Sequence, residues 1–409
     1  MWLAAPLPLR PESDSQVDKN PIDETDLPIP TGRPGDDGQV NKESGSSQSV
    51  VVKVGSSSVT TESGEISMEA ISKLCGEITG AINEGHQVIL VSSGAIASGL
   101  SFLGFPVRPN DIVTLQAVAS VGQRKLMQAY GDAFSERGVV VGQILLGSLD
   151  FANRAQYLHA RRTLAKMLEL GILPVVNEND ATSDDEIRFG DNDRLAALVA
   201  HMVSADLLVL LTDTQGLHTG DPRVHEDASL IEEVREINEA LELLAGGPGS
   251  ASGSGGMASK LQAAKIATWS GVETVIADAS LSNVLKMCVN RTAGVGTVFR
   301  ARSKLLSARK LWIAFAVLTS GTLAVDSGAK EAIVNMEASL LSAGVKDVRG
   351  VFGEGDAVEI AGPDERVFAK GLVSYGSREI ESFAGKNSQL LPVGVSPEIV
   401  HRDDLVVLE

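Results

Sequence analysis

The segment Ser49-Val-Val-Val-Lys-Val-Gly55 is predicted to be a short apolar strand that ends beside a glycine. Residues 1–48 before it are rich in Pro, Asp, Gly and Ser and lack apolar periodicity, so we predict a disordered extension there. After it, helical spacing over Met68 to Asn83 leads to a second apolar strand, Gln87 to Val91, which is followed by Ser92-Ser-Gly94. A helix between two buried strands is typical of a parallel sheet.

The same alternation continues as far as residue 213. Helices are predicted near residues 116–137, 157–170 and 194–203, and strands at 139–146, 172–177 and 206–213. This pattern predicts an α/β domain whose mostly parallel sheet is covered by helices on both faces. Ligands of such sheets bind beyond the carboxyl ends of the strands. Those ends carry Lys53-Val-Gly55, Ser92-Ser-Gly94, Asn177-Glu-Asn-Asp180 and Thr212-Asp213, so we expect the site at this edge.

The pattern changes near residue 305, where short strand-like segments separated by glycines begin. We therefore predict a larger domain at residues 49–305 and a smaller, β-rich domain at residues 306–409. The charged stretch Arg300 to Lys310 is the predicted link. The apolar run Leu311 to Leu318 is too short to span a membrane, and we interpret it as a buried strand.

Composition and charge argue against several classes of protein. The chain has 409 residues and a formal net charge of −18, and residues 308–409 hold 10 Lys and Arg against 15 Asp and Glu. Such an excess of acidic residues disfavours binding to nucleic acid or to anionic lipid. The two cysteines, Cys75 and Cys288, cannot supply a disulfide framework or a thiolate zinc site, and they fit a reducing, cytoplasmic setting. The histidines, among them His201, show no metal-ligand spacing, so no metal site is expected.

Four segments carry candidate chemistry, and each has a plainer alternative. The glycine-rich stretch Gly246 to Lys260 precedes a helix and could cradle phosphate, although a flexible linker fits as well. Lys53 at the end of its strand suits a phosphoryl group but could be a surface lysine. Gly190-Asp-Asn-Asp193 could position lysines or a metal, or only cap a helix. Asn177-Glu-Asn-Asp180 could be a solvated turn. From the residues alone we infer an α/β enzyme with a site for a polyanion.

The order of these motifs along the chain and the identity of their residues are more specific for one family of proteins. The matching segments are Val51-Val-Lys53-Val-Gly55-Ser-Ser, Ser92-Ser-Gly94-Ala-Ile-Ala, Val121-Gly-Gln123, Val176-Asn-Glu-Asn-Asp180, Phe189-Gly-Asp-Asn-Asp193, Leu211-Thr-Asp213, Gly216-Leu217, Asp221-Pro-Arg223 and Gly255-Gly-Met-Ala-Ser-Lys260-Leu. From about Val50 to Phe299 the chain thereby resembles the amino acid kinase family, and within it the glutamate 5-kinases. Residues 310–409 resemble a PUA domain, with Thr322 to Ala329, Gly353-Glu-Gly-Asp356 and His401-Arg-Asp-Asp404.

The resemblance implies ATP-dependent phosphorylation of the γ-carboxylate of L-glutamate to L-glutamyl 5-phosphate, the first step of proline biosynthesis. It assigns catalytic roles to Lys53, Lys260, Asp193 and Asp191, and glutamate binding to Ser93, Asp180 and Asn192. It assigns ATP binding to Lys53, Thr212, Asp213, Ser254, Gly255, Gly256, Met257, Ala258, Ser259 and Lys260, with Mg²⁺ carried mainly by the ATP phosphates. The attacking carboxylate needs no general base, because phosphoryl transfer depends on positioning and charge neutralisation.

The resemblance also implies feedback inhibition by proline and a homo-oligomer. Two positions depart from the pattern of the family: Leu115 stands where many relatives have lysine, and Ser254 replaces a common threonine. Three alternatives stay open at this point. They are another amino acid kinase, such as an acetylglutamate or aspartate kinase, an RNA-binding protein acting through the PUA-like domain, and an inactive regulatory homologue.

Overall fold

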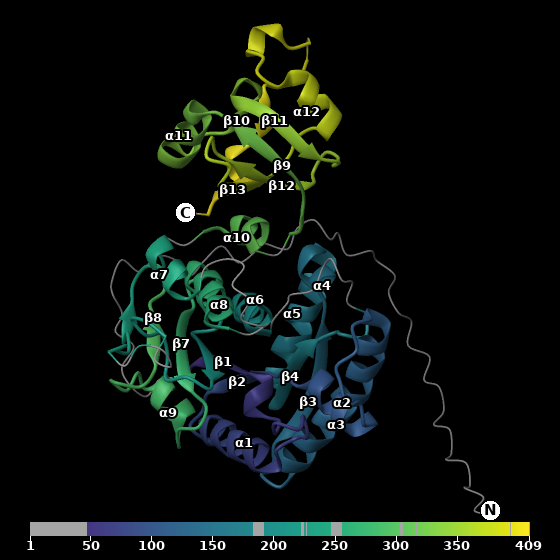
Figure 1. The fold of residues 1–409 in the computed structure, drawn as a ribbon, viewed down its shortest axis with the longest axis vertical. Helices are drawn as coiled ribbons and strands as arrows, with labels where there is room; N and C mark the ends of the chain where they lie inside the picture. The colour runs from purple at the N-terminus through teal and green to yellow at the C-terminus, as the bar shows by residue number, and fades with distance from the viewer. Residues whose placement is uncertain are drawn as a thin grey trace, which may run out of the picture. The chain divides into compact units, whose positions relative to one another are not determined.

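The computed structural model describes residues 47–182, 192–221, 225, 227–246, 256–302, 306–315, 317–392 and 394–408. Its larger domain is built around an eight-stranded sheet with the order β3-β4-β2-β1-β5-β7-β8-β6. Helices surround the strands of this domain (Figure 1). The strands are β1 (Ser49–Val54), β2 (Gln87–Val91), β3 (Val140–Leu146), β4 (Ile172–Glu178), β5 (Leu207–Thr212), β6 (Glu233–Val234), β7 (Glu273–Asp278) and β8 (Thr297–Phe299). The helices are α1 (Met68–Asn83), α2 (Ala95–Leu103), α3 (Ile112–Ser135), α4 (Ser148–Ala152), α5 (Arg154–Glu169), α6 (Asn192–Met202), α7 (Glu239–Leu244), α8 (Met257–Trp269) and α9 (Val284–Val289).

The pairing of the strands brings their carboxyl ends to one edge. All neighbours in this sheet are parallel except β7 and β8, which are antiparallel. Lys53 of β1 lies opposite Val91 of β2 and Leu210 of β5, so these three strands end at the same level. The prediction of a mostly parallel α/β sheet is therefore confirmed.

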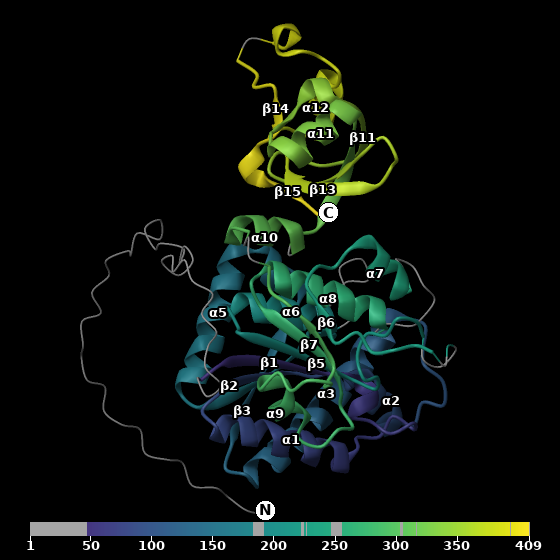
Figure 2. The ribbon, with the colours of Figure 1, turned by 90° about the vertical axis from the view of Figure 1, so that its left-hand side faces the viewer.

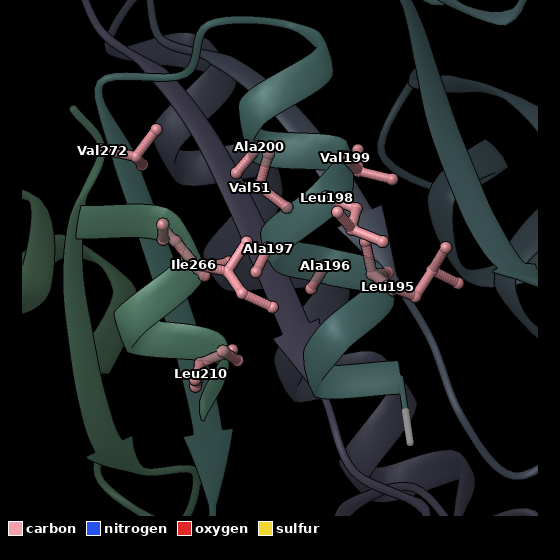
Figure 3. Packing of buried hydrophobic residues seen from close by; sticks show 14 of the residues in the cluster. Val51, Leu195, Ala196, Ala197, Leu198, Val199, Ala200, Leu210, Ile266 and Val272 are labelled. Atoms are coloured by element: carbon pink, nitrogen blue, oxygen red, sulfur yellow. The ribbon is translucent and has the colours of Figure 1, made fainter. Parts of the chain in front are cut away.

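Two hydrophobic clusters cover the two faces of the sheet, as expected when successive strand residues point to opposite sides. Val51 packs with α5, α6 and α8, whereas its neighbours Val50 and Val52 pack with α1, α3 and α9. Figure 2 shows α1 and α9 on one side of the sheet and α6 and α8 on the other. Figure 3 shows Leu195 to Ala200 of α6 packed beside Val51. Both faces are thus buried, which explains the continuous apolar strands.

Helices α2 and α3 pack closely because of glycine. A Cβ on Gly122 of α3 would lie 1.8 Å from the carbonyl oxygen of Ala95, and one on Gly99 would lie 2.1 Å from that of Val118. No larger residue fits either position without moving a backbone. Leu115, in the first turn of α3, is buried, so this side chain serves packing.

The carboxyl-terminal domain is smaller and rich in strands, as predicted. A five-stranded sheet has the order β11-β9-β12-β13-β15, and β10 pairs with β14. Its elements are β9 (Thr319–Val325), α11 (Ser327–Met336), β10 (Leu340–Leu341), β11 (Val345–Gly350), β12 (Ala357–Ala361), β13 (Val367–Leu372), α12 (Ser377–Phe383), β14 (Glu398–Val400) and β15 (Leu405–Val407). Its hydrophobic core includes Leu323, Ile360 and Phe368.

The prediction of a buried strand at Leu311 to Leu318 is wrong. This run belongs mostly to a helix, α10 (Ala308–Phe315), and not to a strand. Leu311 and Ile313 are buried, and the indole Nε1 of Trp312 donates a hydrogen bond to the carbonyl of Phe151 at 3.0 Å. A short unbroken apolar run has no periodicity that separates a buried helix from a strand.

Two predictions on organisation are not tested. The predicted extension lies almost entirely outside the described residues, which begin at residue 47, and residues 303–305 at the predicted domain boundary lie outside them as well. Among the described residues, no helix is both long enough and apolar enough to cross a membrane.

Candidate active site

Two lysines and one aspartate form a buried charged cluster at the carboxyl edge of the sheet. The Nζ of Lys53 lies 2.6 Å from one carboxylate oxygen of Asp193, and the Nζ of Lys260 lies 3.2 Å from the other. The hydroxyl of Ser259 donates to the same second oxygen at 3.0 Å. Asp193 is fully buried, and both lysines are at most 5% exposed. We call Lys53, Asp193, Ser259 and Lys260 the charged cluster.

Each member of the charged cluster is placed by the end of an element. Lys53 is the last but one residue of β1, Asp193 lies in the first turn of α6, and Lys260 lies in the first turn of α8. The partial positive charge of a helix amino terminus favours an anion nearby, and Asp193 occupies such a position. Both helices pack on the same face of the sheet, so their first turns meet over the end of β1.

The cluster places two fixed cations at the carboxyl edge of the sheet. The ammonium groups of Lys53 and Lys260 lie on opposite oxygens of one carboxylate, that of Asp193. Lysine is a common ligand of phosphate groups, so cations fixed at this edge are suited to contact a polyphosphate.

A second group of buried polar side chains consists mainly of neutral amides. The Nδ2 of Asn192 contacts the backbone oxygen of Ser92 at 2.8 Å, the hydroxyl of Ser93 at 2.9 Å and the Oδ1 of Asn177 at 2.8 Å. The Nδ2 of Asn177 in turn donates to the Oε1 of Gln123 at 2.7 Å. We call Ser92, Ser93, Gln123, Asn177 and Asn192 the amide network.

The local backbone explains the position of Ser93. It lies between β2 and α2, and the next residue, Gly94, caps α2 with φ of 104°. A residue with a side chain rarely adopts this left-handed conformation, and a Cβ on Gly94 would lie 3.3 Å from Val59. Glycine thus permits the sharp turn that directs Ser93 toward Asn192.

The two groups meet at the start of α6. Asn192 belongs to the amide network and Asp193, the next residue, belongs to the charged cluster. The start of α6 therefore positions both the charged cluster and the amide network, and the two side chains that do so belong to consecutive residues.

Asp180 lies after β4 and lines a cavity of about 320 Å³. That volume is at the lower end of the range of about 300–1,000 Å³ for small-molecule sites. Asn179, Gln123 and Arg124 line the same cavity. The cavity therefore borders the amide network through Gln123.

The remaining predicted residues are placed as follows. Thr212 ends β5, is buried and donates its hydroxyl to Asp213 at 3.1 Å. Gly256 caps α8, and Met257, Ala258 and Ser259 form its first turn before Lys260. Asp191, Ser254 and Gly255 lie outside the described residues, so their roles stay predictions.

The structure places several further polar residues in the site for which the sequence predicted no role. Ser92, Gln123 and Asn177 are buried parts of the amide network, and the hydroxyl of Tyr130 lies 2.8 Å from that of Ser92. Thr214 Oγ1, just after β5, is buried without a hydrogen-bond partner among the described residues. A cluster of amides and hydroxyls at strand ends was the available signal, but it does not reveal which atoms meet.

His201 packs inside the larger domain, apart from the charged cluster and the amide network. It lies on α6 with its ring 6.4 Å from that of Tyr157. Burial lowers the pKa of His201 to about 4, with a smaller contribution from Arg161. The imidazole is therefore neutral at physiological pH and lies outside both polar groups.

Comparisons of the sequence with known proteins identify the family. A sequence model of the amino acid kinase family matches residues 48–278, and one of the PUA domain matches residues 321–392. The chain is 47% identical to a glutamate 5-kinase of Rhodococcus jostii (strain RHA1) over 89% of this chain and 98% of that protein. It is 41% identical to one of Thermoanaerobacter sp. (strain X514) over 88% and 98%, and 44% identical to one of Nitrosomonas eutropha over 89% and 98%.

The two lysines and the carboxylate of the charged cluster lie at the ends of β1, α6 and α8. All three residues fall within residues 48–278, which the model of the amino acid kinase family matches. The relatives are similar along both domains, not along the larger one alone. The chain belongs to the amino acid kinase family and, within it, to the glutamate 5-kinases that carry a PUA domain.

Proposed function

We propose that this chain transfers the γ-phosphoryl group of ATP to the γ-carboxylate of L-glutamate, the reaction that opens proline biosynthesis. The observation that carries the proposal is the buried charged cluster, in which Lys53 and Lys260 flank Asp193. The names of the relatives agree with glutamate as the acceptor.

The transfer needs no proton to move. A γ-carboxylate oxygen of glutamate attacks the γ-phosphorus of ATP, the bond from that phosphorus to the bridging oxygen breaks, and ADP leaves with the electron pair. Charge spreads over the phosphoryl oxygens, so fixed cations beside them lower the barrier. Lys53 and Lys260 are two buried cations, and Asp193 holds both in place.

The surroundings fit ATP and its metal ion. The first turn of α8 presents backbone N–H groups and Lys260 where phosphates can bind. Bound with ATP, Mg²⁺ would neutralise phosphate charge. Both oxygens of Asp193 already face lysines, so we expect the phosphates to be the main ligands of Mg²⁺.

Glutamate would be held by Ser93, Asp180 and Asn192. The carboxylate of Asp180 suits the α-ammonium group, and Asn192 lies next to Asp193 in the chain, so it can position the substrate relative to the lysines. An acetylated amine carries no charge and would leave Asp180 without this ionic partner. Aspartate is one methylene too short to bring its side-chain carboxylate to the γ-phosphate.

Trapping the acyl phosphate tests the proposal directly. With ATP, Mg²⁺ and hydroxylamine, the enzyme should form a hydroxamate from glutamate at a rate far above that from N-acetylglutamate or aspartate. Equal rates with glutamate and N-acetylglutamate would contradict both the role of Asp180 and the choice of substrate.

Proline shares the α-amino and α-carboxylate groups of glutamate, so we propose that it competes with glutamate for Ser93, Asp180 and Asn192. Initial rates at several proline and glutamate concentrations test the overlap, because glutamate should relieve the inhibition. Inhibition that no glutamate concentration relieves would place proline elsewhere. The proposed homo-oligomer can be measured in the same samples by sedimentation, with and without proline.

We also propose that residues 49–305 form a kinase unit able to bind ATP alone. Helix α10 complicates the choice of end point, because its residues Trp312 and Phe315 contact Phe151 and Arg194. Two truncations, ending at residues 305 and 318, should therefore be compared for ATP binding and hydroxamate formation. Folded truncations that bind no ATP would refute this domain assignment.

A further inference from the structure

Two buried polar atoms of the amide network have no hydrogen-bond partner among the described residues. They are the Nε2 of Gln123, a donor, and the Oδ1 of Asn192, an acceptor. Gln123 is only 8% exposed. A buried polar atom without a partner costs free energy. Such atoms in a substrate site therefore indicate groups that the substrate itself supplies.

The orientation of every amide in this network is fixed by the backbone. The amide of Asn192 contacts the carbonyl of Ser92, which can only accept, so the contacting atom must be the nitrogen. The backbone N–H of Glu178 can only donate, and it lies 2.9 Å from Asn177, so the contacting atom there must be the oxygen. Neither side chain can be turned over without losing such a bond.

The orientation of Gln123 follows from these two. Because the oxygen of Asn177 faces Asn192 and Glu178, its nitrogen faces Gln123, and Gln123 must accept with its oxygen. The Nε2 of Gln123 is then left as a donor. The unpaired donor thus follows from the backbone carbonyl of Ser92 and the backbone N–H of Glu178.

Gln123 and Asp180 line the same cavity of about 320 Å³. One offers a hydrogen-bond donor and the other a carboxylate, which together complement the carboxylate and the ammonium group of an α-amino acid. Arg124 also lines this cavity, but its side chain is exposed. An exposed guanidinium is solvated and less restrained than the buried amide, so it selects substrates less sharply.

We propose that Gln123 determines specificity for a free α-carboxylate, by donating a hydrogen bond from Nε2 to that group of glutamate. The proposal rests on the proposed function, since it concerns the acceptor of the same reaction. Within the site, Asp180 then binds the ammonium group and Gln123 the α-carboxylate, which leaves the γ-carboxylate to extend toward Lys53 and Lys260.

The role of Gln123 can be tested by replacing its amide NH2 group with oxygen and, in the substrate, an α-carboxylate oxygen with NH2. Gln123→Glu keeps an oxygen to accept from Asn177 but replaces the donor by a second carboxylate oxygen. The matched substrate is the α-amide of L-glutamic acid, which keeps the γ-carboxylate and the ammonium group. The quantity to measure is the ratio of kcat/KM for glutamate to kcat/KM for this α-amide, by hydroxamate formation with saturating ATP.

The wild-type ratio should favour glutamate, and Gln123→Glu should lower it by about 30-fold or more. Because both substrates are measured on one preparation, partial unfolding cancels from the ratio. Gln123→Met, uncharged and of similar length, also loses the donor and should lower the ratio about tenfold. Gln128→Glu adds the same charge to an exposed position of α3 and should leave the ratio unchanged.

The outcomes separate this proposal from the function on which it rests. An active wild-type enzyme whose ratio is unchanged in Gln123→Glu and Gln123→Met overturns the role of Gln123 alone. A ratio that falls in Arg124→Gln but not in Gln123→Glu overturns it in favour of the guanidinium. A wild-type enzyme that forms no hydroxamate from glutamate refutes the proposed function, and this proposal with it.

Discussion

The charged cluster and the amide network begin at adjacent residues but are built in opposite ways. Asp193 holds two lysines by ionic contacts, whereas Asn192 holds neutral groups by hydrogen bonds whose direction the backbone fixes. Charges act on any phosphate, and oriented amides distinguish one neutral or ionic group from another. We propose that this site separates catalysis from selection across the peptide bond between Asn192 and Asp193.

The largest expected effect breaks the charged cluster. Lys53→Ala and Lys260→Ala should each lower kcat by about 100- to 1,000-fold, because each removes a fixed cation from beside the transferring phosphoryl group. The KM for glutamate should change much less, since the amide network is intact. Steady-state kinetics with varied glutamate at saturating ATP measure both.

A matched lysine controls for the loss of charge. Lys265 lies on α8 with Lys260 but forms a half-buried ion pair with Glu242, away from the charged cluster, so Lys265→Ala should keep nearly full activity. Variants of Lys53 and Lys260 with wild-type melting temperatures and undiminished kcat would rule out their catalytic roles.

The second prediction concerns α6, which joins the two groups. In the unfolded chain His201 has its ordinary pKa near 6.5, whereas burial lowers the folded pKa to about 4. Below pH 6.5 the unfolded chain therefore binds a proton that the folded chain does not. The stability due to the neutral imidazole is complete above pH 6.5 and declines as the pH falls toward 4, by about 3 kcal/mol at most.

Urea unfolding at several pH values between 7.5 and 4.5 measures this decline. His201→Gln cannot titrate, so its free energy of unfolding should fall less steeply than that of the wild type over this interval. Parallel slopes in the two proteins would show that His201 does not carry the effect. Since α6 carries both groups, kcat and glutamate affinity should be lost together as the helix unfolds.

The third prediction affects substrate selection alone. Asp180→Asn removes the ionic partner of the substrate ammonium group, and loss of one such contact costs roughly 2 kcal/mol or more, about 30-fold in affinity. The KM for glutamate should rise accordingly, while the KM for ATP changes little. Asp132→Asn, an exposed change on α3, is the control. A larger rise in the KM for ATP than in that for glutamate would contradict this role of Asp180.

The difference between the two groups also explains what the sequence could predict. Position at strand and helix ends made Lys53, Asp193 and Lys260 candidates with plainer alternatives, and only the resemblance to a family assigned them catalytic roles. Gln123 and Asn177 are 54 residues apart, and each amide can accept or donate. Their roles depend on which backbone groups face them, and that depends on the packing of α3 on the sheet.

The same reasoning applies to the fold. The sheet could be predicted because continuous apolar runs alternate with segments of helical spacing over many elements. The run at residues 311–318 stands outside that alternation, and a single apolar run does not distinguish a buried helix from a strand. Strand β8 has only three residues, and its sequence does not reveal that it runs antiparallel to β7.

The smallest expected effect lies at the outer end of the amide network. The hydroxyl of Tyr130 is buried 2.8 Å from that of Ser92, and burial raises its pKa well above the ordinary value, so it stays protonated and able to donate. Tyr130→Phe removes this bond, which should lower the free energy of unfolding by about 1 kcal/mol. Ser92 also presents its carbonyl to Asn192, so a small displacement should raise the KM for glutamate a few-fold and leave kcat nearly unchanged. Phe134 lies one turn further along α3 in the same hydrophobic cluster, and Phe134→Leu, which loses packing but no polar contact, should lower stability without changing the KM. If both variants raise the KM equally, packing of α3 and not the hydroxyl of Tyr130 positions the amide network.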